Sequence, residues 1–312
     1  MKEIVNELKA FLRKDFNLYA YGFTFLFLAV CTYLNYTYSF EKKWINSFFY
    51  TPWSKVVYPL YYLLPYLTVV ILTLGIKKEL KKLKQAEFWI KSILFFTIFG
   101  IISHLPPVYR FIDFGNISIG EYMFIHLLSF NASRLLPIIL LFYFIKLIFD
   151  RKDKHLYGLG FEKMSYRPFF LMLLIMLPII AGISFQSDFR AAYPRFRFWK
   201  YGDIFGMSSI KATVIFEIVY GLDFLTTEFM FRGALVIGMA RVLGKDAILP
   251  MAAVYVILHF GKPAAEAVAA FFGGFILGVH SLAKKNIWGG FIVHAGIAFM
   301  MEIAAILQHY YG

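Results

Sequence analysis

Apolar segments of membrane-spanning length recur along the chain and are separated by shorter polar stretches. They cover residues 17–38, 56–76, 88–105, 119–149, 168–186, 211–240, 247–260, 265–283 and 287–308. Because a helix needs about 20 mainly apolar residues to cross a bilayer, this pattern predicts an all-α polytopic bundle of about eight or nine spanning helices. The 312 residues are 60% hydrophobic and 16% charged, whereas soluble domains carry about 25% charged residues. Composition therefore agrees with a multi-pass membrane protein.

Two of these segments are irregular. The 119–149 segment is long and contains Asn131, Arg134 and Pro137, which favours a helix broken near its middle. The 247–260 segment is shorter than a spanning helix, so we expect it to continue past Pro263.

The pattern divides the chain into three parts. Residues 1–16 carry an apolar helical stripe opposite a charged face, which predicts an amphipathic helix on the membrane surface. Residues 17–209 form the N-terminal transmembrane helices, rich in Phe, Tyr and Leu. Residues 210–308 contain small residues such as Gly274 and Gly278, which let helix backbones approach closely. We expect this last part to be a tightly packed core domain.

Basic residues set the expected partners and the orientation. The net charge is +13, but the lysines and arginines cluster at the ends of apolar segments, as membrane anchors do. We therefore expect a lipid bilayer as partner and no nucleic acid. The basic loops hold Lys77, Lys78, Lys81, Lys82 and Lys84, then Arg151, Lys152, Lys154, Lys163 and Arg167, then Lys284 and Lys285. They predict a cytoplasmic N-terminus, although residues 187–200 would then be an external loop that holds four basic residues.

Ionisable residues inside the apolar segments are the candidate site. Glu228 and Arg232 are four residues apart and share one helix face, although an ionised side chain at a bilayer centre costs about 2.5–3.5 kcal/mol on insertion scales. His259 and His294 lie in two further segments. Such residues usually face a bundle interior or a wet cavity, so we expect all of them to meet in one polar cavity. By itself, the Glu228–Arg232 spacing favours a structural ion pair over a working carboxylate held by an arginine.

The order of these motifs resembles a known family. The motifs are Glu228-x-x-x-Arg232-Gly233, Tyr255-x-x-x-His259, a glycine-rich helix and a final membrane His294. Together they resemble the CAAX protease and bacteriocin-processing (CPBP, or ABI) intramembrane proteases, relatives of the type II CAAX prenyl protease. The resemblance implies an intramembrane endopeptidase of a bacterial cytoplasmic membrane, acting on a membrane-associated peptide or protein. It also implies that Glu228, Arg232, His259 and His294 are catalytic.

The family pattern is Glu-Glu-x-x-x-Arg, then Phe-x-x-x-His, then His-x-x-x-Asn, and this sequence departs from it. Thr227 stands at the first glutamate, which in the family activates water, and Ala298 stands at the asparagine. Glu228 is then the expected base, held by Arg232, with Asp223 and Glu266 as alternative carboxylates.

Two further alternatives stay open. One is a non-catalytic relative, a membrane scaffold or immunity-type binding protein that keeps the cavity without the chemistry. The other is a zinc ion held by Glu228, His259 and His294, although no His-Glu-x-x-His motif is present. We expect no cofactor.

Overall fold

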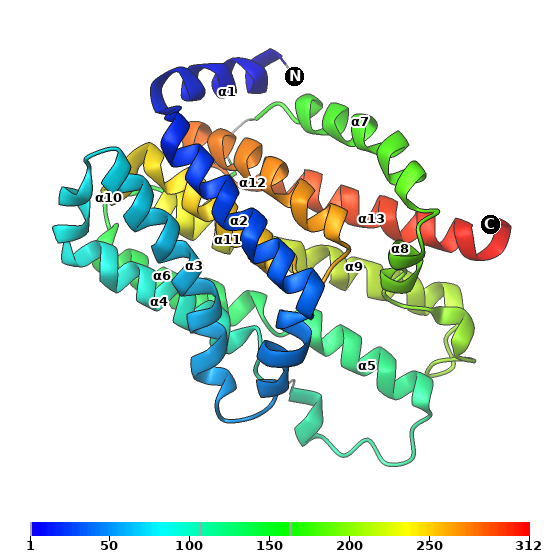
Figure 1. Cartoon of the computed structure of the whole chain (residues 1–312). Helices are drawn as coiled ribbons and strands as arrows, with labels where there is room; N and C mark the ends of the chain where they lie inside the picture. The colour runs from blue at the N-terminus through cyan, green and yellow to red at the C-terminus, as the bar shows by residue number, and fades with distance from the viewer. Residues whose placement is uncertain (1, 107, 162–163) are drawn as a thin grey trace.

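Helices make up the regular structure of the chain (Figure 1). The structure is a computed structural model and describes residues 2–106, 108–161 and 164–312, so the predicted basic residue Lys163 lies outside it. Across those ranges the only β pairing is an isolated bridge between Ile204 and Met207. The predicted all-α class is confirmed.

The helices follow one another in chain order. They are α1 (Lys2–Asp15), α2 (Leu18–Tyr38), α3 (Ser54–Ile76), α4 (Ala86–Ile102), α5 (Ile119–Ala132), α6 (Leu135–Phe149), α7 (Arg167–Ile183), α8 (Ser187–Ala192), α9 (Ser209–Glu228), the π-helix η6 (Phe229–Gly238), α10 (Ala240–Leu243), α11 (Ile248–Leu258), α12 (Ala264–Lys284) and α13 (Trp288–Tyr311). Each predicted apolar segment coincides with one of these helices or with two consecutive ones.

Five helical segments in the described part of the chain are long and apolar enough to cross a membrane. They are α2, α3, the α5–α6 segment, α12 and α13. The other apolar segments fold into shorter helices or join an interrupted one, as α9 joins η6. The chain is a multi-pass helical membrane protein.

The two irregular segments behave differently from each other. The 119–149 segment breaks at residues 133–134, as predicted, between α5 and α6. The expected continuation of the 247–260 segment past Pro263 is wrong, because α11 ends at Leu258 and a turn precedes α12. Proline has no N–H and disfavours a helical residue before it. Side chains of α2 accommodate the turn, since the Tyr36 hydroxyl donates to the Lys262 carbonyl at 2.7 Å.

A fully buried π-helix, η6, lies at the centre of the bundle. It continues directly from α9 and packs against α4, α11 and α12. Gly233 lets the segment between α6 and α7 approach η6, because a Cβ there would lie 2.8 Å from the Tyr157 carbonyl oxygen. The two glycines that the sequence singled out pack against side chains of α11: a Cβ at Gly274 would lie 2.9 Å from the Tyr255 ring, and one at Gly278 would lie 2.5 Å from the Met251 methyl group.

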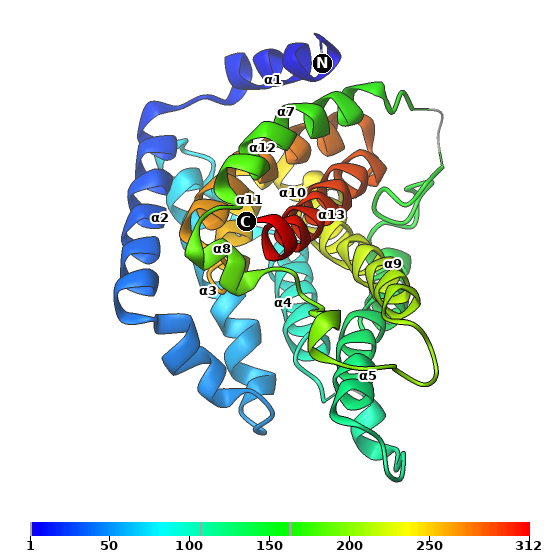
Figure 2. The same ribbon diagram turned by 90° about the vertical axis from the view of Figure 1, so that its right-hand side faces the viewer.

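The predicted basic loops meet at one end of the bundle. Lys77, which follows α3, contacts Asp15 of α1 at 2.7 Å and Asp246 at 2.8 Å. At the same end, Lys284 contacts Glu3 at 2.5 Å. Figure 2 shows α1 crossing the top of the bundle above α7 and α12.

The loop of residues 187–200 lies at the opposite end. The Tyr193 hydroxyl donates to Glu266 Oε2 at 2.9 Å, near the start of α12, and a helix of that length places its other end about 30 Å away. Within this loop the Arg197 guanidinium donates to the carbonyls of Arg190 and Ala191, so this arginine supports the fold of the loop. A count of basic residues does not distinguish such a role from membrane anchoring.

Candidate active site

One face of α9 lines an internal cavity of about 220 Å³. Phe216, Tyr220, Asp223, Phe224 and Thr227 all contribute to its wall. Their spacing of three and four residues is that of a single helical stripe. The cavity therefore has a polar end near Asp223 and Thr227 and an aromatic wall along the preceding turns.

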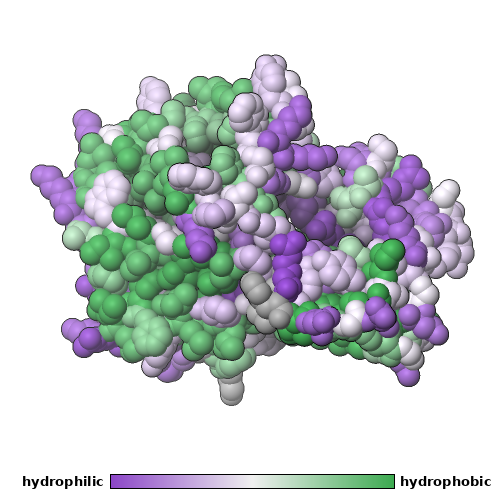
Figure 3. Space-filling model, turned by 90° about the horizontal axis from the view of Figure 1, so that it is seen from below, coloured by the Kyte–Doolittle hydropathy of each residue, from purple (hydrophilic) through white to green (hydrophobic). Residues whose placement is uncertain are grey.

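Other parts of the wall come from α11, α13 and the α5–α6 break. His259 follows the last turn of α11, His294 lies on α13, and Arg134 lies at the α5–α6 break, and all three line the cavity. Seen from below, the molecular surface is hollowed near its middle, between a broad hydrophobic area and a more hydrophilic one (Figure 3).

Glu228 lies next to this cavity but is not among the residues that line it. Its side chain is fully buried, and Oε1 accepts hydrogen bonds from Arg232 at 2.9 Å and from His294 Nδ1 at 3.1 Å. The backbone of Gly290 passes directly over Oε2, where any Cβ would overlap the carboxylate. The guanidinium of Arg232 also lies 4.2 Å above the ring centre of Tyr255. The predicted Glu228–Arg232 pair is therefore present, and it reaches the cavity through His294.

The hydrogen bonds of the two histidines fix which ring nitrogen carries hydrogen. His259 Nδ1 lies 2.8 Å from the Tyr255 carbonyl oxygen, which only accepts, so Nδ1 must donate. His294 Nδ1 faces the Glu228 carboxylate and donates for the same reason. In a neutral imidazole the other nitrogen is then an acceptor. Each ring keeps Nε2 as its acceptor, and that of His294 lies 3.4 Å from the Tyr255 hydroxyl. The two ring centres are 6.3 Å apart.

A second ion pair lies in the cavity wall itself. The Arg134 guanidinium contacts Asp223 Oδ2, and the Arg134 charge also lies 4.7 Å from the ring centre of Phe130. The sequence marked Arg134 only as a residue that breaks an apolar segment and needs a partner. Its partner Asp223 is far along the chain, so sequence spacing gives no signal for the pair.

The far end of the cavity is closed by a polar cluster. Lys262 Nζ donates to the Tyr193 hydroxyl at 2.9 Å, and Tyr193 in turn donates to Glu266. Burial lowers the pKa of the Lys262 ammonium, which the Glu266 charge partly opposes. Burial and the same carboxylate raise the pKa of Tyr193, so its hydroxyl stays protonated and donates. Glu266 is therefore engaged away from the two histidines.

The metal alternative does not suit this geometry. Among the residues that the structure describes, no group of three or more His, Cys, Asp or Glu side chains is placed to hold a metal ion. Oε1 of Glu228 is already occupied by Arg232 and His294 Nδ1, while zinc needs deprotonated ligand atoms directed at one point.

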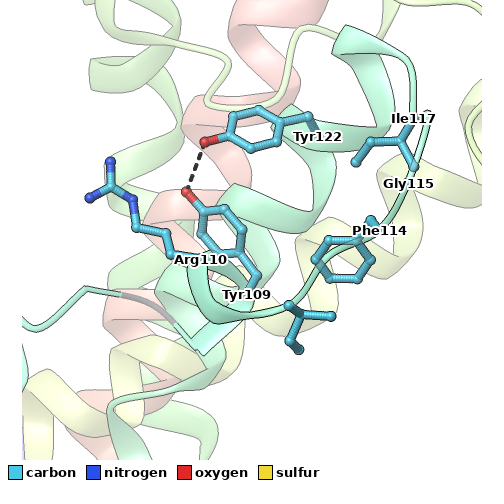
Figure 4. A pocket seen from close by; sticks show the side chains of 7 residues that line it. Tyr109, Arg110, Phe114, Gly115, Ile117 and Tyr122 are labelled. Atoms are coloured by element: carbon cyan, nitrogen blue, oxygen red, sulfur yellow. Dashed lines mark hydrogen bonds between the residues drawn. The ribbon is translucent and has the colours of Figure 1, made fainter.

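Another pocket, of about 400 Å³, lies on the segment that leads into α5. Figure 4 shows the hydroxyls of Tyr109 and Tyr122 facing each other across it, 3.4 Å apart. None of the sequence-predicted site residues lines this pocket.

The fold and the site together define a helical membrane protein with two histidines in a buried polar cavity. Residues 204–300 match the sequence model of the family described as Type II CAAX prenyl endopeptidase Rce1-like. The match includes α9, η6 and α11, most of α13, and every motif residue, so it confirms the resemblance and supports a CAAX-type intramembrane protease fold. No curated protein and no solved structure matches the chain.

Proposed function

We propose that the protein is an intramembrane endopeptidase that hydrolyses a peptide bond of a membrane-associated peptide or protein inside the α9 cavity. The observation that carries this proposal is the pair His259 and His294. They come from different helices, line one cavity, and each has Nδ1 held by a buried acceptor. Packing alone gives no reason to aim two such rings at the same space.

In the proposed site, Glu228 acts on water through His294. The carboxylate fixes the His294 tautomer so that Nε2 accepts a hydrogen from the attacking water, and Arg232 holds the carboxylate in place. This is the logic of an acid that orients a histidine in hydrolytic triads. The sequence predicted direct contact between Glu228 and water, but its complete burial favours the indirect role.

His259 has the complementary task. His259 lines the same cavity and its Nε2 is a hydrogen-bond acceptor. In the proposed complex, Nε2 accepts a hydrogen bond from a backbone N–H of the bound peptide. The reaction needs no metal or cofactor. We place the protein in a bacterial cytoplasmic membrane, with the N-terminus and the basic loops inside and α1 on the membrane surface.

The test is cleavage of membrane proteins in cells that express the chain. New peptide N-termini are mapped by mass spectrometry in membranes containing the wild type, His259→Gln, His294→Gln or the control His309→Gln. His309 stacks on Trp199 outside the cavity. We expect termini that require both cavity histidines and do not require His309.

The non-catalytic relative predicts a different result. If no terminus depends on His259 or His294 while both variants fold and accumulate normally, the peptidase proposal is wrong. The cavity would then serve binding alone.

A further inference from the structure

The two positions that depart from the family pattern both face the cavity. Thr227 replaces a carboxylate that would activate water, and Ala298 replaces an amide that would stabilise the oxyanion, and both line the wall. The site described so far therefore has only the neutral His294 ring toward the water. It lacks a carboxylate that touches water and a donor for the developing negative charge.

Asp223 stands one helical turn before Thr227, about 6 Å along the axis, and on the same face. It lines the cavity, and its neighbour Phe224 packs its ring 4.4 Å from the His294 ring. The Asp223 side chain is 10% exposed. Oδ2 contacts Arg134, but Oδ1 has no hydrogen-bond partner within the described ranges. A buried carboxylate oxygen normally has one, so its position favours a role toward a bound molecule.

Arg134 presents the matching donor. The break between α5 and α6 brings its guanidinium to the cavity wall. Its Nε is buried, and the described residues offer it no acceptor. A preorganised N–H of this kind, aimed at the position where negative charge develops, is what stabilises an oxyanion.

We propose that the Asp223–Arg134 pair supplies both of the functions lost at residues 227 and 298. This inference rests on the proposed peptidase function. The water oxygen bonds to the scissile carbonyl carbon while one of its protons passes to Asp223 Oδ1. Its other hydrogen stays on that oxygen and is donated as a hydrogen bond to His294 Nε2. The carbonyl oxygen takes the negative charge and accepts a hydrogen bond from Arg134. The C–N bond then breaks, and Asp223 returns the proton to the leaving nitrogen.

Rescue variants test the assignment of Asp223. The assay follows a quenched fluorescent peptide that carries a cleavage sequence mapped in the membrane experiment, with purified full-length protein in detergent. Asp223→Asn should lower kcat about 10²–10⁴-fold, the usual worth of general-base catalysis. The double variant Asp223→Asn with Thr227→Glu should recover a large part of the rate, because it restores a carboxylate on the same face one turn later.

The same design tests Arg134. Removal of one oxyanion donor typically lowers kcat about 10²–10³-fold, and we expect a loss of that size for Arg134→Gln. Adding Ala298→Asn should return part of the rate, since it restores an amide donor to the cavity wall. Glu217→Gln is the control for Asp223→Asn. It also changes a carboxylate of α9 to an amide, but outside the cavity lining, and it should leave the rate unchanged.

The outcomes separate this inference from the function on which it rests. Rescue at both positions supports the pair. A folded Asp223→Asn variant with the wild-type rate, while His294→Gln is inactive, overturns the pair and leaves the peptidase intact. A third result is that Asp223→Asn loses rate without rescue by Thr227→Glu, or Arg134→Gln without rescue by Ala298→Asn. Either loss overturns the claim that the pair replaces the two family residues. Absence of any cleavage by the wild type overturns both proposals.

Discussion

Two buried ion pairs in this protein differ in how completely their atoms are satisfied. Lys91 of α4 is fully buried, and its ammonium reaches Asp150 at 2.7 Å, Glu87 at 3.1 Å and the Gly238 carbonyl at 2.6 Å. Lys91 Nζ also donates to Asp150 Oδ1 at 2.9 Å, and the Tyr157 hydroxyl donates to Asp150 Oδ2 at 2.8 Å. In the Arg134–Asp223 pair, by contrast, one carboxylate oxygen and one guanidinium nitrogen are left without partners among the described residues.

The difference separates structural from reactive charge. A closed network such as that of Lys91 has no atom left for a ligand, and its Gly238 bond ties α4 to the end of η6. The pair at Asp223 has unused hydrogen-bonding capacity and borders a cavity. Buried polar groups normally find partners, so incomplete satisfaction beside a cavity is a better indication of function than burial or charge alone.

The largest stability loss is expected where the closed network is broken on one side. Lys91→Met leaves Asp150 buried without its cation, and breaking a buried pair in this way costs roughly 3–5 kcal/mol. Thermal unfolding in detergent measures the loss. Lys91→Met combined with Asp150→Asn removes both charges and should recover much of the stability. A single variant as stable as the wild type would show that the network does not hold α4 to η6.

Arg232 belongs to the proposed active site but is as deeply buried as Lys91. Arg232→Ala leaves Glu228 as an unpaired buried carboxylate, so it should also cost about 3–5 kcal/mol and lower the amount of folded protein in membranes. Arg241→Ala is the control, because the Arg241 side chain is 62% exposed and exposed pairs contribute about 0–1 kcal/mol. Equal unfolding temperatures for the two variants would contradict the structural role of Arg232.

A smaller effect is expected at Gly290. A Cβ there would overlap Glu228 Oε2, and overpacking of this kind usually costs about 1–3 kcal/mol. Gly290→Ala should also lower kcat, because it displaces the carboxylate that orients His294. Gly273→Ala is the matched control, since a Cβ at Gly273 would meet nothing within 4 Å. An unchanged rate in Gly290→Ala would separate Glu228 from the chemistry.

The smallest effect concerns the network at the basic end, outside the membrane-spanning segments. Burial acts to raise the pKa of the Asp246 carboxyl, but hydrogen bonds from Lys77 and Lys82 oppose it, and the pKa lies below its usual value. Because the pKa is lowered by folding, ionised Asp246 adds to the free energy of unfolding. That contribution is complete above the unfolded-state pKa of about 3.9 and is lost as pH falls through the lower folded-state value. Unfolding temperature should therefore drop below about pH 4, and Asp246→Asn should weaken that dependence.

The sequence predicted the helical class well, and three of the four expected site residues contact one another, for a physical reason. Apolar segments of spanning length leave few folds open, and Glu228, Arg232 and His294 contact one another because ionisable groups in such segments must share partners. What the sequence did not reveal was the pairing of Arg134 with Asp223. That contact depends on where α5 breaks and on how α9 is rotated, and tertiary packing determines both.

The same rotation decided how Glu228 is placed. Adjacent residues on a helix point about 100° apart, so the face that presents Thr227 to the cavity turns Glu228 toward Arg232 and Gly290. Spacing alone showed that residues 227 and 228 point in different directions. Only the packing of α9 shows which of the two borders the cavity.

The most direct test of the central claim makes one substitution in each ion pair and measures peptide cleavage per folded molecule. Asp223→Asn and Asp150→Asn are the same chemical change. We predict that Asp223→Asn keeps most of its unfolding temperature and loses about 10²–10⁴-fold in kcat, whereas Asp150→Asn unfolds at a lower temperature and cleaves at the wild-type rate while folded. Equal kcat values for the two variants would contradict the account.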